Sequence, residues 1–182
     1  TISITSGGTA DLANITSNGT LTVDAVGLVQ QVGSGSVLAA DALRVTTANN
    51  GAITLTNAGN DLAKVKLQSR NPADNDVGSG AIALHDVDGF AVSEISTTGN
   101  ATLTALGAIT TDSVVFGDGH IVANALSVKT LNDAGADILL TAATNDVNTL
   151  TLKARNADDS AIAGETTTPT GTIRFTDFDG VA

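Results

Sequence analysis

The most constraining feature of this sequence is that it repeats itself. The segment ITLTNAGNDLAKVKLQSRN, from Ile53 to Asn71, is matched without a gap by ILLTAATNDVNTLTLKARN, which runs from Ile138 to Asn156 and begins 85 residues later. The Asn-Asp pair, the aliphatic positions and the closing Arg-Asn recur at the same spacing. A chain of 182 residues that carries one pattern twice is expected to build one structural unit twice.

The match extends on both sides of this segment, so the repeated unit is long. The further matches are ADALRVTT at 40–47 with ANALSVKT at 123–130, GAIALHDVDG at 80–89 with GTIRFTDFDG at 171–180, and TLT at 20–22 with TLT at 102–104. The largest insertion falls in the polar stretch 156–171, which we expect to be a loop. We predict one structure over residues 1–182 that holds about two copies of a repeat, approximately 15–96 and 97–182.

Each copy consists of short strand-like segments separated by Gly, Asn or Asp. Thr, Val and Ile favour pleated strands, and the separating residues favour turns. Within a segment the side chains alternate, so that Ile53 and Leu55 are apolar whereas Thr54 and Thr56 are polar. No stretch has the periodicity and caps of a long helix. The chain is therefore predicted to be all-β.

The composition distinguishes between all-β architectures. Hydrophobic residues make up 42% of the chain, yet there are only four Phe and no Trp, Tyr, Met or Cys. A β-sandwich usually fills its centre with large aromatic side chains, whereas stacked coils place similar aliphatic residues above one another at about 4.8 Å. We predict a parallel β-helix (β-solenoid) with about 20 residues per coil and about eight or nine coils. The alternative is a pair of tandem β-sandwich domains, one per repeat.

The charge excludes one class of partner. The chain has 8 Lys and Arg against 19 Asp and Glu, which gives a formal net charge of −11. Such a surface repels a phosphate backbone, so nucleic acid is not an expected partner. No apolar run is long enough to span a bilayer, so we expect no membrane insertion. The absence of Cys leaves stability to packing and hydrogen bonds.

Two Asp-x-Asp-Gly motifs are the candidates for a metal site. They are DVDG, with Asp86 and Asp88, and DFDG, with Asp177 and Asp179. Alternating carboxylates before a glycine turn begin many calcium loops, because Ca²⁺ prefers several oxygen ligands and a sharp bend. The Glu that completes such a loop is missing, and Asp and Gly also make ordinary corners between coils. No cofactor is predicted, and calcium at these four aspartates is the candidate left open.

Catalysis is not favoured by any set of residues. A polysaccharide-active β-helix needs paired carboxylates, or a base with an Arg or a metal, in a groove. Asp86, Asp88 and Arg70 are the residues that could supply this set, but they follow the repeat, and the chain has no Trp or Tyr to stack on a sugar ring. His85 and His120 lack partners at ligand spacing and are expected at the surface. We predict that the protein is not an enzyme, with a polysaccharide-active β-helix as an alternative.

One stretch resembles a known family. The sequence ISTTGNATLTALGAITTDS at 95–113 is similar to the repeats of filamentous-haemagglutinin-like large exoproteins, and NGTLTVDAVGLV at 18–29 is a second copy of the pattern. The resemblance implies a right-handed parallel β-helix that serves as the shaft of a secreted bacterial surface adhesin. The N-terminal secretion motifs of that family do not occur in this sequence, so the resemblance concerns the shaft and neither its export nor its receptor.

The repeat, the composition and the resemblance together predict a structural protein. We expect an extracellular β-solenoid segment of a bacterial surface adhesin, filament or biofilm matrix protein. The chain opens on TISITSGG without a Met, which favours a piece of a longer or processed protein. Its expected partners are copies of itself joined head to tail, or flanking repeats of a longer chain, together with a host or neighbouring cell surface. The alternative function is a pair of calcium-stabilised immunoglobulin-like adhesin domains.

Overall fold

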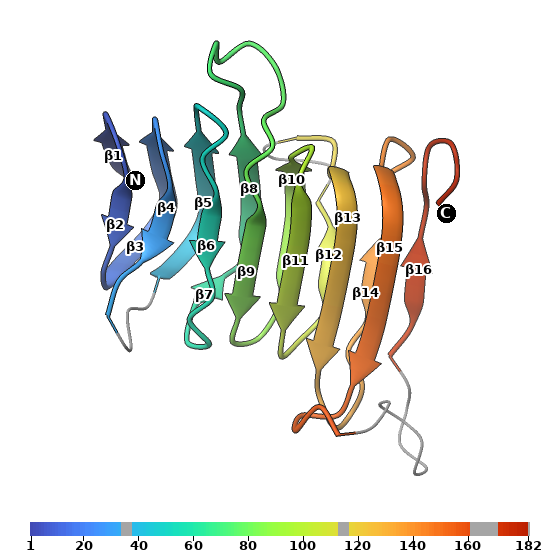
Figure 1. Cartoon of the computed structure of the whole chain (residues 1–182). Coiled ribbons are helices and arrows are strands. Elements are labelled where there is room, and N and C mark those ends of the chain that lie inside the picture. The colour runs from blue at the N-terminus through green and yellow to red at the C-terminus, as the bar shows by residue number, and fades with distance from the viewer. Residues whose placement is uncertain (34–37, 113–116, 161–170, 182) are drawn as a thin grey trace.

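The protein is built from strands alone over the residues that the computed structural model describes, which are 1–33, 38–112, 117–160 and 171–181. Sixteen strands in these residues form one sheet, and every ladder between two strands is parallel. The one antiparallel pairing in these ranges is an isolated bridge between Arg70 and Val77. Figure 1 shows the strands stacked side by side along one axis, from the blue N-terminal strands to the red C-terminal ones.

Two long rows of strands make up most of the sheet. Row one contains, in order, β1 (Ile2–Ser6), β3 (Ile15–Ala25), β5 (Leu38–Thr47), β8 (Lys64–Ser69), β10 (Phe90–Ser96), β12 (Ile109–Thr111), β14 (Ile138–Leu140) and β16 (Ile173–Phe175). Row two contains β2 (Ala10–Leu12), β4 (Val29–Gln31), β6 (Ile53–Leu55), β9 (Ile82–Asp86), β11 (Asn100–Ala105), β13 (His120–Leu131) and β15 (Asp146–Arg155). The chain alternates between the rows, one strand of each per turn.

A shorter third side closes the coil between the rows. The first residues of β3 and β5 form it together with β7 (Asp61–Leu62), so that Ser17 pairs with Ala40 and Ala40 pairs with Leu62. A similar side recurs later in the chain, where residues 94–96 of β10 pair with residues 120–122 of β13. Successive coils of parallel strands confirm the predicted parallel β-helix. The tandem β-sandwich alternative is wrong, because a sandwich requires antiparallel sheets that face one another.

The coils are less regular in length than the sequence suggested. Partners in neighbouring rungs are 19 residues apart from Ile2 to Leu21, but 35 apart from Ile138 to Ile173. The predicted value of about 20 therefore describes only the shortest coils. The longer coils carry extra residues between strands, where a loop leaves the stacking of the rungs undisturbed. The loop predicted at 156–171 lies mostly outside the described residues, which omit 161–170.

The core consists of the predicted aliphatic ladders. In row two, Ile53 and Leu55 stack on Ile82 and Leu84, and all four side chains are at most 1% exposed. Thr54, between the first two, is exposed. Neighbouring parallel strands lie about 4.8 Å apart, so similar side chains on successive rungs fill the interior without large aromatic residues.

The pairing registers show that β1, β9 and β16 occupy equivalent places in the repeat. β1 pairs with β3 through Ile2 and Leu21, and β9 pairs with β11 through Ile82 and Ala101, so each partner begins 19 residues later. β9 also pairs with β6, as β16 pairs with β14. The strand β9 therefore ends one repeat and begins the next, and β1 and β16 are copies of it.

This register corrects one of the sequence matches. Ile4 of β1 pairs with Val23, and Leu84 of β9 pairs with Leu103. Val23 and not Leu21 therefore occupies the place of Leu103. The TLT segment at 102–104 corresponds to residues 22–24, two residues later than the sequence alone suggested.

The second repeat is turned about the axis relative to the first. β5 and β8 lie in row one, but their counterparts β13 and β15 lie in row two, whereas β6 of row two has its counterpart β14 in row one. The change arises because the first repeat contributes seven strands, an odd number, to two rows that the chain visits in turn. As a consequence, the described chain begins and ends with a strand of row one.

Glycines stack at the corner between row one and row two. A Cβ atom added to Gly51 would lie 2.3 Å from the carbonyl oxygen of Gly27, and one added to Gly80 would lie 2.1 Å from that of Gly51. In the second repeat, a Cβ atom on Gly107 would lie 1.4 Å from the carbonyl oxygen of Asp88. Because no side chain tolerates such contacts, glycine is what lets successive corners approach to the spacing of the rungs.

Candidate functional site

The two Asp-x-Asp-Gly motifs form corners of the solenoid. Asp86, at the end of β9, is fully buried. Its Oδ1 accepts hydrogen bonds from the backbone N–H groups of Asp88 and Gly89 at 3.2 and 2.8 Å, and its Oδ2 accepts one from the N–H of Leu62 at 2.9 Å. Asp86 thus closes its own turn and binds the preceding rung.

Burial also changes the acidity of Asp86. Loss of solvent raises its pKa to about 7, and a hydrogen bond with the Asp88 carboxyl acts in the same direction, while the N–H groups of Gly89, Asp88 and Leu62 oppose the rise. The carboxyl therefore holds a proton more readily than an exposed aspartate does. A carboxyl that is partly neutral and already accepts three backbone bonds is a weak ligand for Ca²⁺.

Asp177 makes the same corner in the C-terminal rung. Its Oδ1 accepts hydrogen bonds from the N–H groups of Asp179 and Gly180 at 3.4 and 2.9 Å, and its Oδ2 accepts one from Val147 at 3.2 Å. Gly180 has a φ of 102°, which only glycine adopts readily. The first aspartate of each motif therefore has a backbone-binding role.

Asp88 and Asp179 are the exposed members of the motifs. The described ranges contain no group of three or more His, Asp or Glu side chains placed to hold a metal ion. The geometry of Asp86 and Asp177 adds no support for a metal, and calcium at the four aspartates stays an open candidate.

A buried asparagine bridges three rungs of the first repeat. Asn60 is fully buried, and its Oδ1 accepts a hydrogen bond from the N–H of Leu38 at 3.0 Å. Its Nδ2 donates to the carbonyl oxygens of Leu55 and His85 at 3.2 and 3.0 Å, and the Gln31 amide bonds it at 2.7 and 3.1 Å. Every polar atom of the side chain is used, so Asn60 supplies partners for groups that would otherwise be buried without one.

Asn145 repeats this arrangement in the second copy. It is also fully buried, accepts a hydrogen bond from the N–H of Ile121 at 2.8 Å, and donates to the carbonyl oxygens of Leu140 and Thr176 at 3.1 and 2.8 Å. The Asn-Asp pair that recurs in the sequence therefore places an asparagine with the same hydrogen-bonding role in both copies. The left-handed backbone that Asn tolerates occurs elsewhere, at Asn49 and Asn50.

A cluster of charged residues joins Lys64 and Lys66 of β8 to acidic partners that the sequence did not identify. Glu94 of β10 is 7% exposed, and it pairs with Lys66 Nζ and Gln68 Nε2, both at 2.5 Å. The Nε2 of His120 lies 3.9 Å from it, and Nδ1 of the same ring bonds Asp118. The hydrogen bond from His120 lowers the pKa of Asp118. His120 is thus half-buried rather than at the open surface as predicted.

A second carboxylate extends this charged cluster. Asp112 is 7% exposed, accepts a hydrogen bond from Ser93 Oγ at 2.9 Å, and lies 3.4 Å from Lys64 Nζ. Each carboxylate therefore has a cationic and a neutral partner, which is the arrangement of a structural ion-pair cluster. Its members come from strands that only the fold brings together, although the alternation of β8 does place Lys64 and Lys66 on the outer face.

Arg70 does not join the two aspartates with which it was considered as a catalytic set. Arg70 bonds Asp74, with Nη2 3.3 Å from the carbonyl oxygen and Nε 3.5 Å from the carboxylate. Asp86 instead accepts hydrogen bonds from Leu62 of β7 and from the turn that follows β9. The structure therefore does not assemble the set of Asp86, Asp88 and Arg70. His85 is half-buried rather than at the open surface as predicted, and burial, followed by the charge of Lys129, lowers its pKa.

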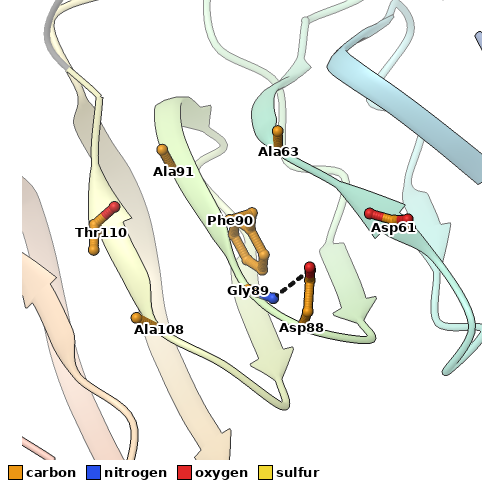
Figure 2. Close-up of a pocket in the computed structure, with 8 residues that line it drawn as sticks. All are labelled: Asp61, Ala63, Asp88, Gly89, Phe90, Ala91, Ala108 and Thr110. Carbon is orange, nitrogen blue, oxygen red and sulfur yellow. Dashed lines mark hydrogen bonds between the residues drawn. The ribbon is translucent and has the colours of Figure 1, made fainter. Parts of the chain in front are cut away.

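One hollow in the described residues lies beside β7, on the short third side of the first repeat. It has a volume of about 450 Å³ and is open to solvent. Figure 2 shows its lining, which consists of Asp61, Ala63, Asp88, Gly89, Phe90, Ala91, Ala108 and Thr110. The Phe90 ring is 3% exposed and belongs to the core, so it offers no face for stacking a ligand. Small side chains and two exposed carboxylates give this hollow little means of holding a substrate.

These features define the chain as a repeat protein with a β-solenoid fold. Residues 1–68 match a family model described as "Repeats of unknown function (DUF5649)". No curated protein and no solved structure matches the chain. Among the described residues there is no helix of the length and apolarity required to cross a membrane.

Proposed function

We propose that the chain is a structural segment of the shaft of a bacterial surface adhesin, filament or matrix protein, located outside the cell and without catalytic activity. Its role is to hold two ends apart as a stiff rod. The observation that supports this most is the continuity of the sheet. Row one runs through eight strands and row two through seven in the described residues, with no interruption between the repeats.

The corners support a rigid rod as well. A solenoid bends most easily where the chain leaves one strand for the next, because those backbone groups have no partner in a ladder. Here Asn60, Asp86 and Asn145 are fully buried at such corners and bind N–H or carbonyl groups of neighbouring rungs. Each corner is thereby fixed to the one beneath it.

The surface chemistry favours a location outside the cell. The resemblance of residues 95–113 to large-exoprotein repeats points to a secreted shaft. A chain without Cys has no thiol to oxidise, and a net charge of −11 limits unspecific association. The partners proposed are further copies or flanking repeats along the axis, with a host or neighbouring cell surface at the tip.

Surface labelling of cells tests the location. An antibody raised against the folded chain should label intact cells of the source organism as strongly as permeabilised cells. Labelling that requires permeabilisation would refute an extracellular shaft.

Small-angle X-ray scattering on the chain should give the cross-section of a thin rod. Breakdown of a polysaccharide that is lost in Asp88→Asn would refute the non-catalytic role.

A further inference from the structure

The strand β9 shows what a complete boundary between repeats looks like. It pairs with β6 on one edge and with β11 on the other. Its copy β1 pairs only with β3, and its copy β16 pairs only with β14, among the described residues. Each end of the solenoid therefore presents half of the boundary that β9 completes in the middle.

The free edge of β16 is able to accept a strand. Ile138 donates its N–H to the carbonyl oxygen of Thr172, and Thr176 donates its N–H to that of Leu140. Backbone groups alternate in direction along a strand, so Ile173 and Phe175 present theirs to the open edge. Ile173 is also 44% exposed, and Phe175 is only partly buried.

The two rows set a condition on any second copy. Row one contains eight strands of the described chain and row two contains seven. If a second copy simply stacked its β1 on β16, row one would gain a rung while row two was left with a gap one strand wide, about 4.8 Å. Both rows continue without a gap only if one of the two equivalent strands, β16 of the first copy or β1 of the second, is displaced from the sheet.

We propose that a second copy of this chain joins head to tail by rung exchange, in which β16 of one copy takes the place of β1 in the next. The free edge of β16 then pairs with β3 of the second copy, as β9 pairs with β11. The free edge of β15 pairs with the segment around β2, as β8 pairs with β10. This inference rests on the proposed role as a rod and specifies the contact by which the rod grows.

The corner residues decide which strand is displaced. Asp177 Oδ2 accepts the N–H of Val147, and Thr176 accepts a hydrogen bond from Asn145, so β16 is tied to the rung before it. The residue of β1 at the place of Asp177 is Ser6. Its hydroxyl accepts the N–H of Gly8 and donates to the carbonyl of its own turn, and it is too short to replace both carboxylate oxygens. We therefore expect β16 to remain paired with β14, and β1 of the second copy to dissociate from β3.

Cysteine crosslinking tests the register directly, because the chain contains no Cys of its own. In β9 and β11, His85 pairs with Thr104. The equivalent pair across the proposed junction is Thr176 of one copy and Asp24 of the next, both exposed at present. Adjacent strands hold paired Cα atoms about 5 Å apart, within the range for a disulfide.

The experiment mixes the full-length variant Thr176→Cys with either Asp24→Cys or Thr5→Cys at high concentration under mild oxidation. In the single chain, Thr5 of β1 pairs with Asp24 of β3. Rung exchange replaces β1 by β16 of the other copy, so it predicts a mixed dimer with Asp24→Cys and none with Thr5→Cys. A mixed dimer with Thr5→Cys would show simple stacking and refute the exchange. No mixed dimer with either partner would refute the junction altogether.

Two further substitutions keep the result interpretable. The first is Ile173→Pro, added to the Thr176→Cys chain. It removes an N–H from the open edge of β16 and leaves the hydrogen bonds to β14 intact, so it should abolish the dimer. Ile173→Val is the matched control and should retain the dimer. Ile4→Ala, added to the Asp24→Cys chain, weakens the hold of β1 and should raise the yield. Far-ultraviolet circular dichroism confirms that each variant is folded. Crosslinking tests the junction and cell labelling tests the location, so either can fail without the other.

Discussion

Asp86 makes the stability of this protein depend on pH in an unusual direction. Its folded pKa of about 7 lies above the ordinary value of 3.8, chiefly because the carboxyl is buried. Between these values the folded state binds the proton more tightly than the unfolded chain, so the contribution of Asp86 to stability is full below about pH 4 and falls as the pH rises toward 7. Asp86→Asn, which cannot ionise, should gain stability relative to the parent over this range, by about 4 kcal/mol at most. Urea unfolding of both proteins from about pH 4 to 7.5 measures this difference. A difference that is constant with pH would contradict it.

Asn60 should be among the most sensitive polar positions. Asn60→Ala leaves the N–H of Leu38 and the carbonyl groups of Leu55 and His85 without their side-chain partner in a buried corner. We expect a loss of about 2–4 kcal/mol in the free energy of unfolding. The exposed Asn75 is the control, and Asn75→Ala should change stability by less than about 0.5 kcal/mol. Equal effects of the two substitutions in urea unfolding would show that the corner does not depend on Asn60.

At this scale, the sequence predicts the direction of side chains better than their partners. Alternation was enough to place Ile53 and Leu55 inside, because the period of a strand is a local property. The same pattern could not show that Asp86 binds the N–H of Leu62, since that contact is set by which rungs are neighbours. The sequence therefore left calcium binding and corner formation both open for Asp86, and only the structure shows its oxygens accepting backbone hydrogen bonds.

At the scale of elements, the corners depend on glycine. Gly51 lies between β5 and β6, where an added Cβ would meet Gly27 at 2.3 Å, whereas nothing lies within 4 Å of a Cβ added to Gly8. Gly51→Ala should force the corners apart and cost about 2–4 kcal/mol. Gly8→Ala should change stability by less than about 1 kcal/mol. Thermal melting of the two variants compares them, and a neutral Gly51→Ala would mean that the rungs separate easily.

The charged cluster on β8 and β10 should contribute more than an ion pair at the open surface. Glu94→Ala leaves Lys66, with a side chain only 17% exposed, without its carboxylate at the bulge of β10. We expect a loss of about 3 kcal/mol, since the remaining charge is largely desolvated. The matched control is Lys129→Ala, which breaks the exposed pair with Asp159 and should cost less than about 1 kcal/mol. Similar losses for the two variants would place Glu94 in effectively open solvent.

The order of strands could be predicted from the sequence, but the assignment of strands to rows could not. The match of residues 53–71 with 138–156 shows which segments correspond, because both copies keep the same polar corner. It does not show that β14 lies in row one while β6 lies in row two. That exchange follows from the odd number of row strands in each repeat, seven before β9 and seven from β9 to β15, and matched segments do not reveal how many strands lie between them.

At the scale of the whole molecule, the solenoid is expected to be stable without a bound metal ion. The net charge of −11 draws cations to the surface in general, so a specific site has to be distinguished from screening. A Ca²⁺ site at 100 times its dissociation constant would add about 2.7 kcal/mol and raise the melting temperature of a domain this size by about 5–10 °C. We expect instead that the melting temperature agrees within about 1 °C in EDTA and in CaCl₂ at matched ionic strength. The reason is that the oxygens of Asp86 and Asp177 accept backbone hydrogen bonds at their corners. A rise of about 5 °C with CaCl₂, lost in the double variant Asp88→Asn and Asp179→Asn, would instead show that the exposed aspartates complete calcium sites at these corners.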